Sequence, residues 1–366
     1  MSIKALFLNN YDMTGAWHAW KANEYPSNHL WGIPEMRAAG IEIDILPHEK
    51  FRALTGYWRF QKLMKLNSLD LLSLDQQWRA VFRSNYDLIY SGVHTHTHLL
   101  ASLRSKGLFR KPVVSVIYTH ELPTSDVESY IHGHDKLICL SQKIEDKLKA
   151  DLNVPAHKLT TIRWAVDIGF YGDVGNSDSR GLNCQRPVVM SAGKSGRDYN
   201  TLVESVRGLD CQLEIFCSER SLPTISEIPA NVGLRFGKKD ETAVPYRQLV
   251  EHYRMANVVA IPVARINEGL VGYTSLLEAM VMGKPVVMTR HPYIDIDIEQ
   301  EGIGIWVNPG DIHQWRSAIE HVISRPAEAA EMGKRSRRLC EERFDIRQFA
   351  AKVADVFQGV LAHRNQ

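Results

Sequence analysis

Two glycine-bearing loops carry the residues best suited to bind an anion. The first lies in the stretch EGLVGYTSLLEAMVMGKPVV, residues 268–287, where hydroxyl-bearing residues follow a glycine and precede an apolar helix. Backbone N–H groups at the start of a helix, beside glycines that let a ligand approach, suit a diphosphate. The candidate binding residues in this stretch are Gly272, Tyr273, Thr274, Ser275 and Glu278.

The same stretch also has a purely structural interpretation. Ser275 and Glu278 have the S-x-x-E spacing of a capping box, in which each side chain satisfies a backbone N–H at the helix start. Gly283 is expected to end the helix in a left-handed conformation, and Pro285 prevents its continuation. Taken alone, this spacing favours a capped helix over a binding site.

The second loop, SAGKSGRDYNTL, follows the apolar run PVVMSA and places two cations among glycines. Gly193, Lys194 and Arg197 would form an anion clamp at the end of this strand. Asp198 is the expected N-cap of the next helix. A solvated turn would explain one such loop, but two of them in one sheet favour a ligand site.

The pattern HTHTH at residues 94–98 and the D-x-D pattern of Asp295 and Asp297 suggest rival metal sites. Imidazoles at alternate positions of a strand would share one face and suit a metal ion. Because no cysteine or carboxylate cluster accompanies them, we expect His94 to line a cleft and His98 to begin a helix. The D-x-D pattern is interpreted as a surface loop, and no metal or cofactor is expected.

These residues must be positioned by short apolar runs that alternate with helical patterns, which predicts parallel sheets covered on both faces. Residues 172–187 are rich in Gly, Asn, Ser and Asp and are interpreted as a linker. We therefore predict an α/β protein of two Rossmann-like doubly wound domains, residues 1–171 and 188–344. Residues 345–366 are predicted to form a helix with one apolar face.

The elements that we predict are strands at residues 3–8, 41–46, 87–91, 113–118, 136–141, 187–193, 211–217, 257–263 and 285–290, and helices at residues 97–107, 141–152, 198–209 and 246–256.

Composition narrows the function classes. The chain has 366 residues, more than one hydrophobic core usually serves, and its net charge of +2 gives no argument for nucleic-acid binding. Five cysteines without a C-x-x-C pair, and no run of about 20 apolar residues, predict a cytoplasmic protein. The basic and aromatic segment 49–66 would either lie on the inner face of an anionic membrane or pack as an ordinary helix.

The stretch GYTSLLEAMVMGKPVV resembles the donor-binding signature of the retaining glycosyltransferases of family 4, also called group 1. Weaker similarity follows in the family's order, in VVSVIYTHE, HDKLICLSQKIEDKL, KLTTIRWAVDIGFY, VVMSAGKSGRDYNTLVESV and GIGIWVNPGD. The resemblance implies a GT-B fold, in which an N-terminal acceptor domain and a C-terminal donor domain face across a cleft. It also implies that the last helix returns to the first domain.

The resemblance further implies transfer of a sugar from a nucleotide-diphosphate sugar to a hydroxyl acceptor, with retention and without a metal ion. At matching positions, Glu278 would accept hydrogen bonds from the ribose hydroxyls of the donor. Thr274 and Ser275 would hold the diphosphate, and Lys194 and Arg197 would neutralise charge on the leaving group. The acceptor, which is a glycan, a lipid or a small metabolite, is not specified.

The chain also departs from the family pattern. Where the family carries a glutamate eight residues before the position of Glu278, this chain has Leu270, and Glu268 is the candidate substitute. His120 would reach the donor sugar from the first domain, while Gly15 and His94 are further acceptor or cleft candidates. The change at Leu270 keeps open a catalytically silent subunit that binds nucleotide or glycan, and the layout also suits a nucleotide-sugar epimerase.

Overall fold

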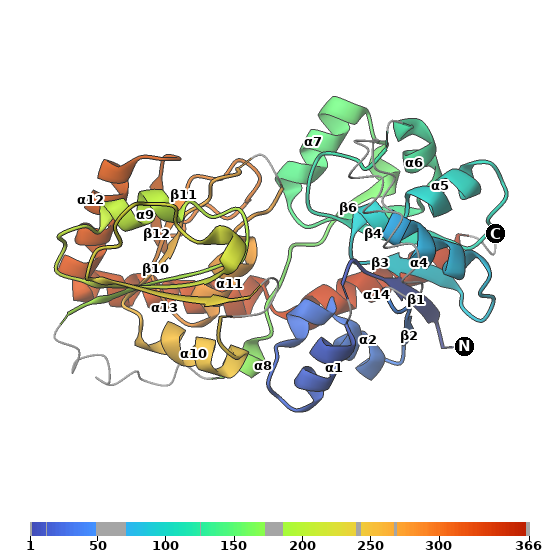
Figure 1. Ribbon diagram of the computed structural model, residues 1–366. Helices are drawn as coiled ribbons and strands as arrows, with labels where there is room; N and C mark the ends of the chain where they lie inside the picture. Colours follow the sequence, from blue (N-terminus) through green and yellow to red (C-terminus); the bar gives the residue numbers. More distant parts are fainter. Residues whose placement is uncertain are drawn as a thin grey trace. The chain divides into compact units, whose positions relative to one another are not determined.

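The computed structural model describes residues 2–11, 13–48, 71–124, 126–172, 186–238, 243–266 and 269–363, without the side chains of 71–73. The chain forms two compact units, each of which is a parallel sheet flanked by helices (Figure 1). The first unit contains residues 1–22, 27–164 and 346–366, and the second contains 23–26 and 165–345. The predicted membrane segment 49–66 and most of the predicted linker lie outside the described residues.

The first sheet has the strand order β2-β1-β3-β4-β5-β6, and all its neighbouring strands are parallel. The strands are β1 (Lys4–Leu8), β2 (Glu42–Ile45), β3 (Leu88–Ser91), β4 (Val113–Ile117), β5 (Lys136–Cys139) and β6 (Leu159–Thr161). Every residue of β3 and β4 is buried, as expected for central strands covered on both faces.

The second sheet is also parallel and has the order β12-β11-β10-β7-β8-β9. Its strands are β7 (Val188–Ala192), β8 (Gln212–Ser218), β9 (Val232–Gly237), β10 (Val258–Ile261), β11 (Val286–Thr289) and β12 (Gly304–Val307). Counted from β7, this is the strand order of a Rossmann fold. The nine predicted strands are confirmed to within one or two residues at most ends, whereas β6, β9 and β12 were not predicted.

Helices flank both sheets. In the first unit they are α1 (Thr14–Lys21), α2 (Ile33–Ala38), α4 (Leu71–Val81), α5 (His98–Ser105), α6 (Val127–Gly133), α7 (Gln142–Leu152) and α14 (Ile346–Ala362). In the second unit they are α8 (Ile168–Tyr171), α9 (Tyr199–Ser205), α10 (Tyr246–Met255), α11 (Tyr273–Val281), α12 (Ile312–Ser324) and α13 (Pro326–Arg343). No helix among the residues described here is long and apolar enough to cross a membrane.

The C-terminal helix α14 belongs to the first unit and packs against α2 (Figure 1). The ring of Phe357 lies 5.2 Å from that of Tyr90, and the ring of Phe349 lies 5.3 Å from that of Trp164. The predicted apolar face of this helix is therefore its packing face. Of the residues predicted for that face, Val356 and Val360 are only partly buried, and the others are buried: Ile346, Phe349, Val353 and Phe357.

The boundary between the units lies after Trp164, earlier than the expected boundary after residue 171. The chain between these positions belongs to the second unit because α8 packs there: the guanidinium of Arg247 lies 4.1 Å from the ring centroid of Phe170 and donates to its carbonyl oxygen at 3.1 Å. Residues 23–26 also join the second unit. Arg247 Nε donates to the carbonyl oxygen of Asn23 at 2.7 Å, and the ring of Tyr25 lies 4.9 Å from that of Tyr246.

The backbones of α5 and α6 pack closely at Gly133, and a substitution there tests the packing of the first unit. A Cβ added at Gly133 would lie 2.1 Å from the carbonyl oxygen of Ala101, so the two backbones must separate to accept a side chain. We expect Gly133→Ala to lower the free energy of unfolding by about 3 kcal/mol. Gly359→Ala is the control, because nothing lies within 4 Å of its added Cβ in α14, and there we expect a gain of about 0.5–1 kcal/mol. Equal urea-unfolding curves for the two variants would contradict this packing.

Candidate functional site

The order of the second sheet locates its ligand crevice. The chain runs outward from β7 in both directions, first through β8 and β9 and then through β10, β11 and β12. In open parallel sheets, ligands bind beyond the carboxyl ends of the strands at the point where the direction reverses. Here that point lies between β7 and β10, and the two loops that follow these strands are the two anion-binding loops expected from sequence.

Hydrogen bonds join these two loops. The N–H of Asp198 donates to the carbonyl oxygen of Pro262 at 3.1 Å, and the N–H of Ala264 donates to that of Gly196 at 3.0 Å. Gly196 has a φ of +63°, and a Cβ there would lie 2.8 Å from Val271. Asp198 caps α9 as expected, since its carboxylate accepts from the N–H of Thr201. The two loops therefore form one preorganised surface.

Arg197 is the cation that this surface fixes in place. Its Nη2 donates to Ser275 Oγ at 2.9 Å, and its Nη1 donates to the carbonyl oxygen of Ser195 at 3.1 Å. A Cβ at Gly193 would lie 2.4 Å from its Nε, so the guanidinium packs directly on that glycine. The buried Nε has no hydrogen-bond partner among the described residues. The guanidinium is thus held rigidly while part of its donor capacity stays unused.

The start of α11 overturns the capping-box interpretation. The helix begins at Tyr273 with Gly272 as N-cap at a φ of +90°, and no side chain caps it. Ser275 is already inside the first turn, and its Oγ donates to the carbonyl oxygen of Ala192 at 3.0 Å. The helix starts earlier than the S-x-x-E pattern indicates because Gly272 accepts a left-handed conformation that other residues resist.

The end of α11 follows the prediction. Gly283 has a φ of +61°. Its N–H donates to the carbonyl oxygen of Met280, and the N–H of Lys284 donates to that of Ala279, both at 3.0 Å. This pair of bonds is the Schellman motif, which confirms Gly283 as the residue that ends the helix.

Glu278 is buried and bound by three tyrosines. Its Oε1 accepts from the hydroxyls of Tyr246 at 2.7 Å and Tyr171 at 3.2 Å, and its Oε2 accepts from Tyr253 at 2.9 Å. We call Tyr171, Tyr246 and Tyr253 the tyrosine cage. Burial first, and then the charge of Glu278, raises the pKa of each phenol well above its usual value, so all three remain donors.

Sequence reasoning missed the cage. Tyr246 and Tyr253 are seven residues apart on α10, a spacing that puts them on one face of the helix and was a usable signal. Tyr171 lies on α8, far from both in sequence, and no local pattern connects it to Glu278.

The other donor-site candidates differ in exposure. Tyr273 is buried, Thr274 is partly buried, and the side chain of Lys194 is exposed. The backbone of Lys194 is fixed, since its carbonyl oxygen accepts from Ser218 Oγ at 2.7 Å and Ser221 Oγ at 2.9 Å. Glu268 lies outside the described residues, so its proposed substitution for the glutamate absent at Leu270 remains a prediction.

In the first unit, His94 and His120 follow the neighbouring strands β3 and β4. His94 is buried in a short 3-10 turn, with its ring 5.1 Å from that of Tyr118, and His120 is partly buried. Gly15 lies in α1 with open space around it. These three residues belong to the first unit, whereas the loops described above belong to the second.

The histidine pattern does not run along a strand. His94 and His96 lie in the 3-10 turn, and His98 begins α5 as predicted. Among the residues that the structure describes, no group of three or more His, Cys, Asp or Glu side chains is arranged to hold a metal ion.

Burial of two histidines in the first unit predicts acid sensitivity. Burial lowers the pKa of His134 from 6.5 to about 3, and burial together with the nearby His96 lowers that of His94 to about 4. Below pH 6.5 the unfolded chain binds protons that the folded chain does not, so stability is full above pH 6.5 and falls as the pH drops toward these lowered values. Within this pH range, each histidine lowers the free energy of unfolding by about 1.4 kcal/mol for every pH unit that the pH falls.

The measurement is urea unfolding at several pH values between 4 and 7. His134 Nδ1 lies 2.6 Å from the carbonyl oxygen of Tyr130, and Nε2 lies 2.9 Å from Thr97 Oγ1. His134→Gln is therefore expected to cost stability at neutral pH but to flatten the slope by about 1.4 kcal/mol per pH unit. Parallel slopes for the variant and the original protein would contradict the burial of a neutral imidazole.

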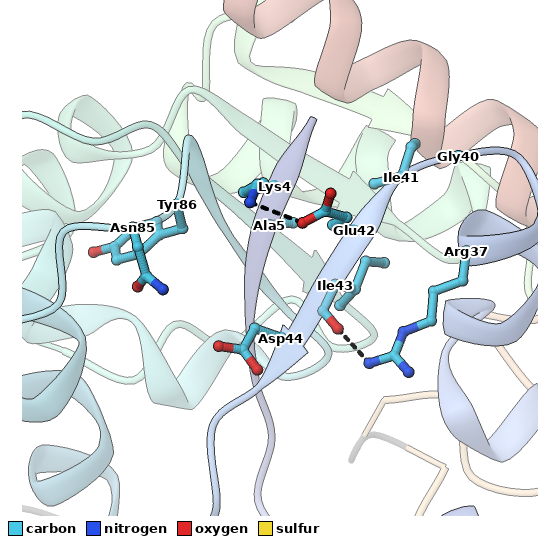
Figure 2. A pocket seen from close by; sticks show the side chains of 10 residues that line it. All are labelled: Lys4, Ala5, Arg37, Gly40, Ile41, Glu42, Ile43, Asp44, Asn85 and Tyr86. Atoms are coloured by element: carbon cyan, nitrogen blue, oxygen red, sulfur yellow. Dashed lines mark hydrogen bonds and ion pairs between the residues drawn. The ribbon is translucent and has the colours of Figure 1, made fainter. Parts of the chain in front are cut away.

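A separate open cavity of about 560 Å³ lies at the amino ends of β1 and β2 (Figure 2). Its charged groups are engaged within the protein: Lys4 pairs with Glu42 at 3.0 Å, Asp44 pairs with Arg83 at 3.0 Å, and Arg37 donates to the carbonyl oxygen of Ile43. Since parallel sheets bind ligands at the opposite ends of their strands, this cavity is not the candidate site.

Comparison with known proteins agrees with this geometry. Sucrose-phosphate synthase from Thermosynechococcus elongatus has a TM-score of 0.67 at 15% identity, with 99% of this chain and 100% of that chain covered. Anabaena Alr3699/HepE, in complex with UDP and glucose, has a TM-score of 0.64 at 14% identity, with 98% and 100% covered. Such identities establish the fold alone. The two Rossmann-like sheets define an α/β protein with the GT-B glycosyltransferase fold.

A family model and a curated relative match shorter parts of the chain. Residues 242–339 match the family model described as Glycosyl transferases group 1, so this part of the second unit carries the group 1 segment that the sequence resembles. D-inositol 3-phosphate glycosyltransferase from Saccharomonospora viridis is 31% identical over 116 residues, which are 32% of this chain and 26% of that protein. The chain thus matches about a quarter of the length of this relative.

Proposed function

We propose that this chain is a retaining glycosyltransferase that moves a sugar from a nucleotide-diphosphate sugar to a hydroxyl acceptor. The observation that carries the proposal is Arg197, which is fixed against Ser275 and Gly193 at the switch point of a GT-B donor unit. A cation held there is suited to the developing negative charge of a leaving nucleoside diphosphate. Ser275, to which it is bonded, lies within the segment that matches the group 1 family model.

The remaining residues have roles that fit the same ligand. Thr274 and the first turn of α11 offer hydroxyl and N–H donors to the diphosphate. Lys194, exposed on the neighbouring loop, adds a second positive charge, and Glu278 would accept hydrogen bonds from the ribose. The acceptor contacts of His94, His120 and Gly15 and the role of Glu268 stay predictions.

The reaction needs few proton-transfer groups. The bond between the anomeric carbon and the donor phosphate breaks, and a bond from the same carbon to the acceptor oxygen forms on the same face. The proton of the acceptor hydroxyl passes to the leaving diphosphate. Arg197 and Lys194 lower the cost of the charge that develops, so we propose that no metal ion is required.

A catalytically silent binding subunit is the second candidate, and Leu270 in place of the family glutamate is the observation that favours it. It would bind the nucleotide without transferring the sugar. A nucleotide-sugar epimerase would instead release a changed nucleotide sugar with no acceptor present. Contact of residues 49–66 with an anionic membrane is a separate prediction, tested by sedimentation with anionic and with neutral liposomes.

Calorimetric titration with UDP, GDP, ADP and dTDP tests the proposal, first without metal and then with magnesium. The UDP complex of the HepE structure makes UDP the first nucleotide to try. We expect one base to bind without metal, which would select the donor for an acceptor screen. If no nucleoside diphosphate binds under either condition, the donor site is wrong. Binding without sugar transfer in that screen would favour the silent subunit.

A further inference from the structure

The three phenols of the tyrosine cage are not equivalent. Tyr171 and Tyr253 are 2% and 0% exposed, so both side chains are enclosed within the protein. Tyr246 is partly exposed, although it makes the shortest of the three bonds to Glu278, at 2.7 Å. Tyr246 is also the first residue of α10, so no helical turn precedes it and covers its side chain. Of the three tyrosines, Tyr246 is therefore the one whose side chain is least enclosed and can most readily turn away from Glu278.

Glu278, which binds the tyrosine cage, lies on the helix that follows the anion-binding loop after β10. Ser275 and Glu278 are three residues apart and occupy adjacent turns of one face of α11, and Ser275 holds Arg197. The positive charge of Arg197 also acts on Tyr253, where it opposes the rise in the phenol pKa that burial and Glu278 cause. We therefore expect a nucleotide whose diphosphate contacts Arg197 to have its ribose near Glu278.

The bond from Tyr246 to Glu278 is the kind that a ribose hydroxyl would make. Both are O–H donors to a buried carboxylate, so an exchange conserves the number of bonds to Glu278. Leaving the carboxylate buried with one bond fewer would be costly, so this position on Glu278 requires an O–H donor from either the protein or a ligand. The rings of Tyr25 and Phe170, 4.9 Å and 6.3 Å from that of Tyr246, bound the space into which its ring can turn.

We propose that Tyr246 holds the place of a donor ribose hydroxyl on Glu278 and is displaced when the nucleotide binds, whereas Tyr171 and Tyr253 remain as positioning residues. This inference rests on the proposed function, because it needs a nucleotide donor. On this inference, the Tyr246 hydroxyl competes with the ligand for Glu278, whereas the Tyr253 hydroxyl holds Glu278 in position to bind it. The two tyrosines therefore have opposite effects on affinity.

The test compares Tyr246→Phe, Tyr253→Phe and the original protein by calorimetry, with the ribonucleoside diphosphate that binds in the panel above. Without its competing hydroxyl, Tyr246→Phe is expected to lower the Kd about threefold or more, and to widen the preference for the ribonucleotide over its 2′-deoxy and 3′-deoxy forms. Tyr253→Phe is expected to raise the Kd about tenfold and to narrow that preference. Thermal unfolding without ligand should show both variants less stable than the original protein.

Tyr86→Phe is the matched control, because it also removes one buried phenol hydroxyl, bonded at 2.7 Å to the carbonyl oxygen of Ala80 in the first unit. Its Kd should equal that of the original protein. A Tyr246→Phe variant that binds more weakly, or equally well with an unchanged ribose preference, overturns the inference and leaves the proposed function standing. Failure of the original protein to bind any nucleoside diphosphate overturns both.

Discussion

Replacing Arg197 with alanine is expected to raise the Kd for the donor nucleoside diphosphate by about 10- to 100-fold, the usual cost of losing a charge-assisted hydrogen bond in a fixed geometry. The reason is the rigid placement of the guanidinium by Ser275, Ser195 and Gly193, which spares the ligand the cost of ordering it. Calorimetry at two salt concentrations measures the effect, and the loss should be smaller at high salt because the phosphate contact is electrostatic.

Arg207→Ala is the matched control for this prediction. Arg207 lies in the same unit and its Nη2 pairs with Glu204 at 2.8 Å, but it follows the end of α9 that is opposite to the anion-binding loop after β7. Its removal should leave the Kd unchanged. If the two arginine variants bind alike, the anion clamp is misplaced.

Glu278→Ala is expected to lower the stability of the second unit strongly. The substitution removes the common acceptor of three tyrosine hydroxyls, two of them fully buried, and each orphaned hydroxyl costs about 1 kcal/mol or more. We therefore expect the free energy of unfolding to fall by about 3 kcal/mol. The same variant should lose affinity for the nucleotide when it is measured at a temperature where it stays folded.

Glu320→Ala is the matched control, because it removes a carboxylate that is not bound by buried donors. Glu320 is half exposed on α12 and lies 3.5 Å from Arg316, and such surface pairs contribute less than about 1 kcal/mol. Urea unfolding and nucleotide titration of both variants complete the comparison. A Glu278→Ala protein that binds nucleotide normally would remove Glu278 from the donor site, even if its stability falls as expected.

Much of the fold and part of the site could be predicted because their signals are local. Continuous apolar runs marked the central strands, and glycines with cations marked the loops after β7 and β10. The two loops were predicted to belong to one sheet. Because parallel strands present their carboxyl ends at one edge of a sheet, the loops lie together there, and the bonds from Asp198 to Pro262 and from Ala264 to Gly196 join them. Asp198 and Gly283 were assigned correctly for the same reason, because caps depend on their immediate neighbours.

The prediction failed where a pattern has two local interpretations. Ser275 and Glu278 fit a capping box, but Gly272 starts the helix one turn earlier, and both side chains then serve distant partners. The strands that were missed, β6, β9 and β12, all lie at sheet edges. Edge strands need less apolar sequence because one side of each is not covered by a neighbour, as the half-exposed residues of β9 illustrate.

The sequence by itself determined the two Rossmann-like units and the loops at the switch point, because hydrophobic period and turn chemistry act between near neighbours. Only the tertiary structure decided the surroundings of Glu278. Tyr171 and Glu278 are 107 residues apart, and Tyr253 reaches the same carboxylate from a third helix. A buried charge is satisfied by whichever donors the packing of helices brings to it, and that packing depends on contacts that no short stretch of sequence contains.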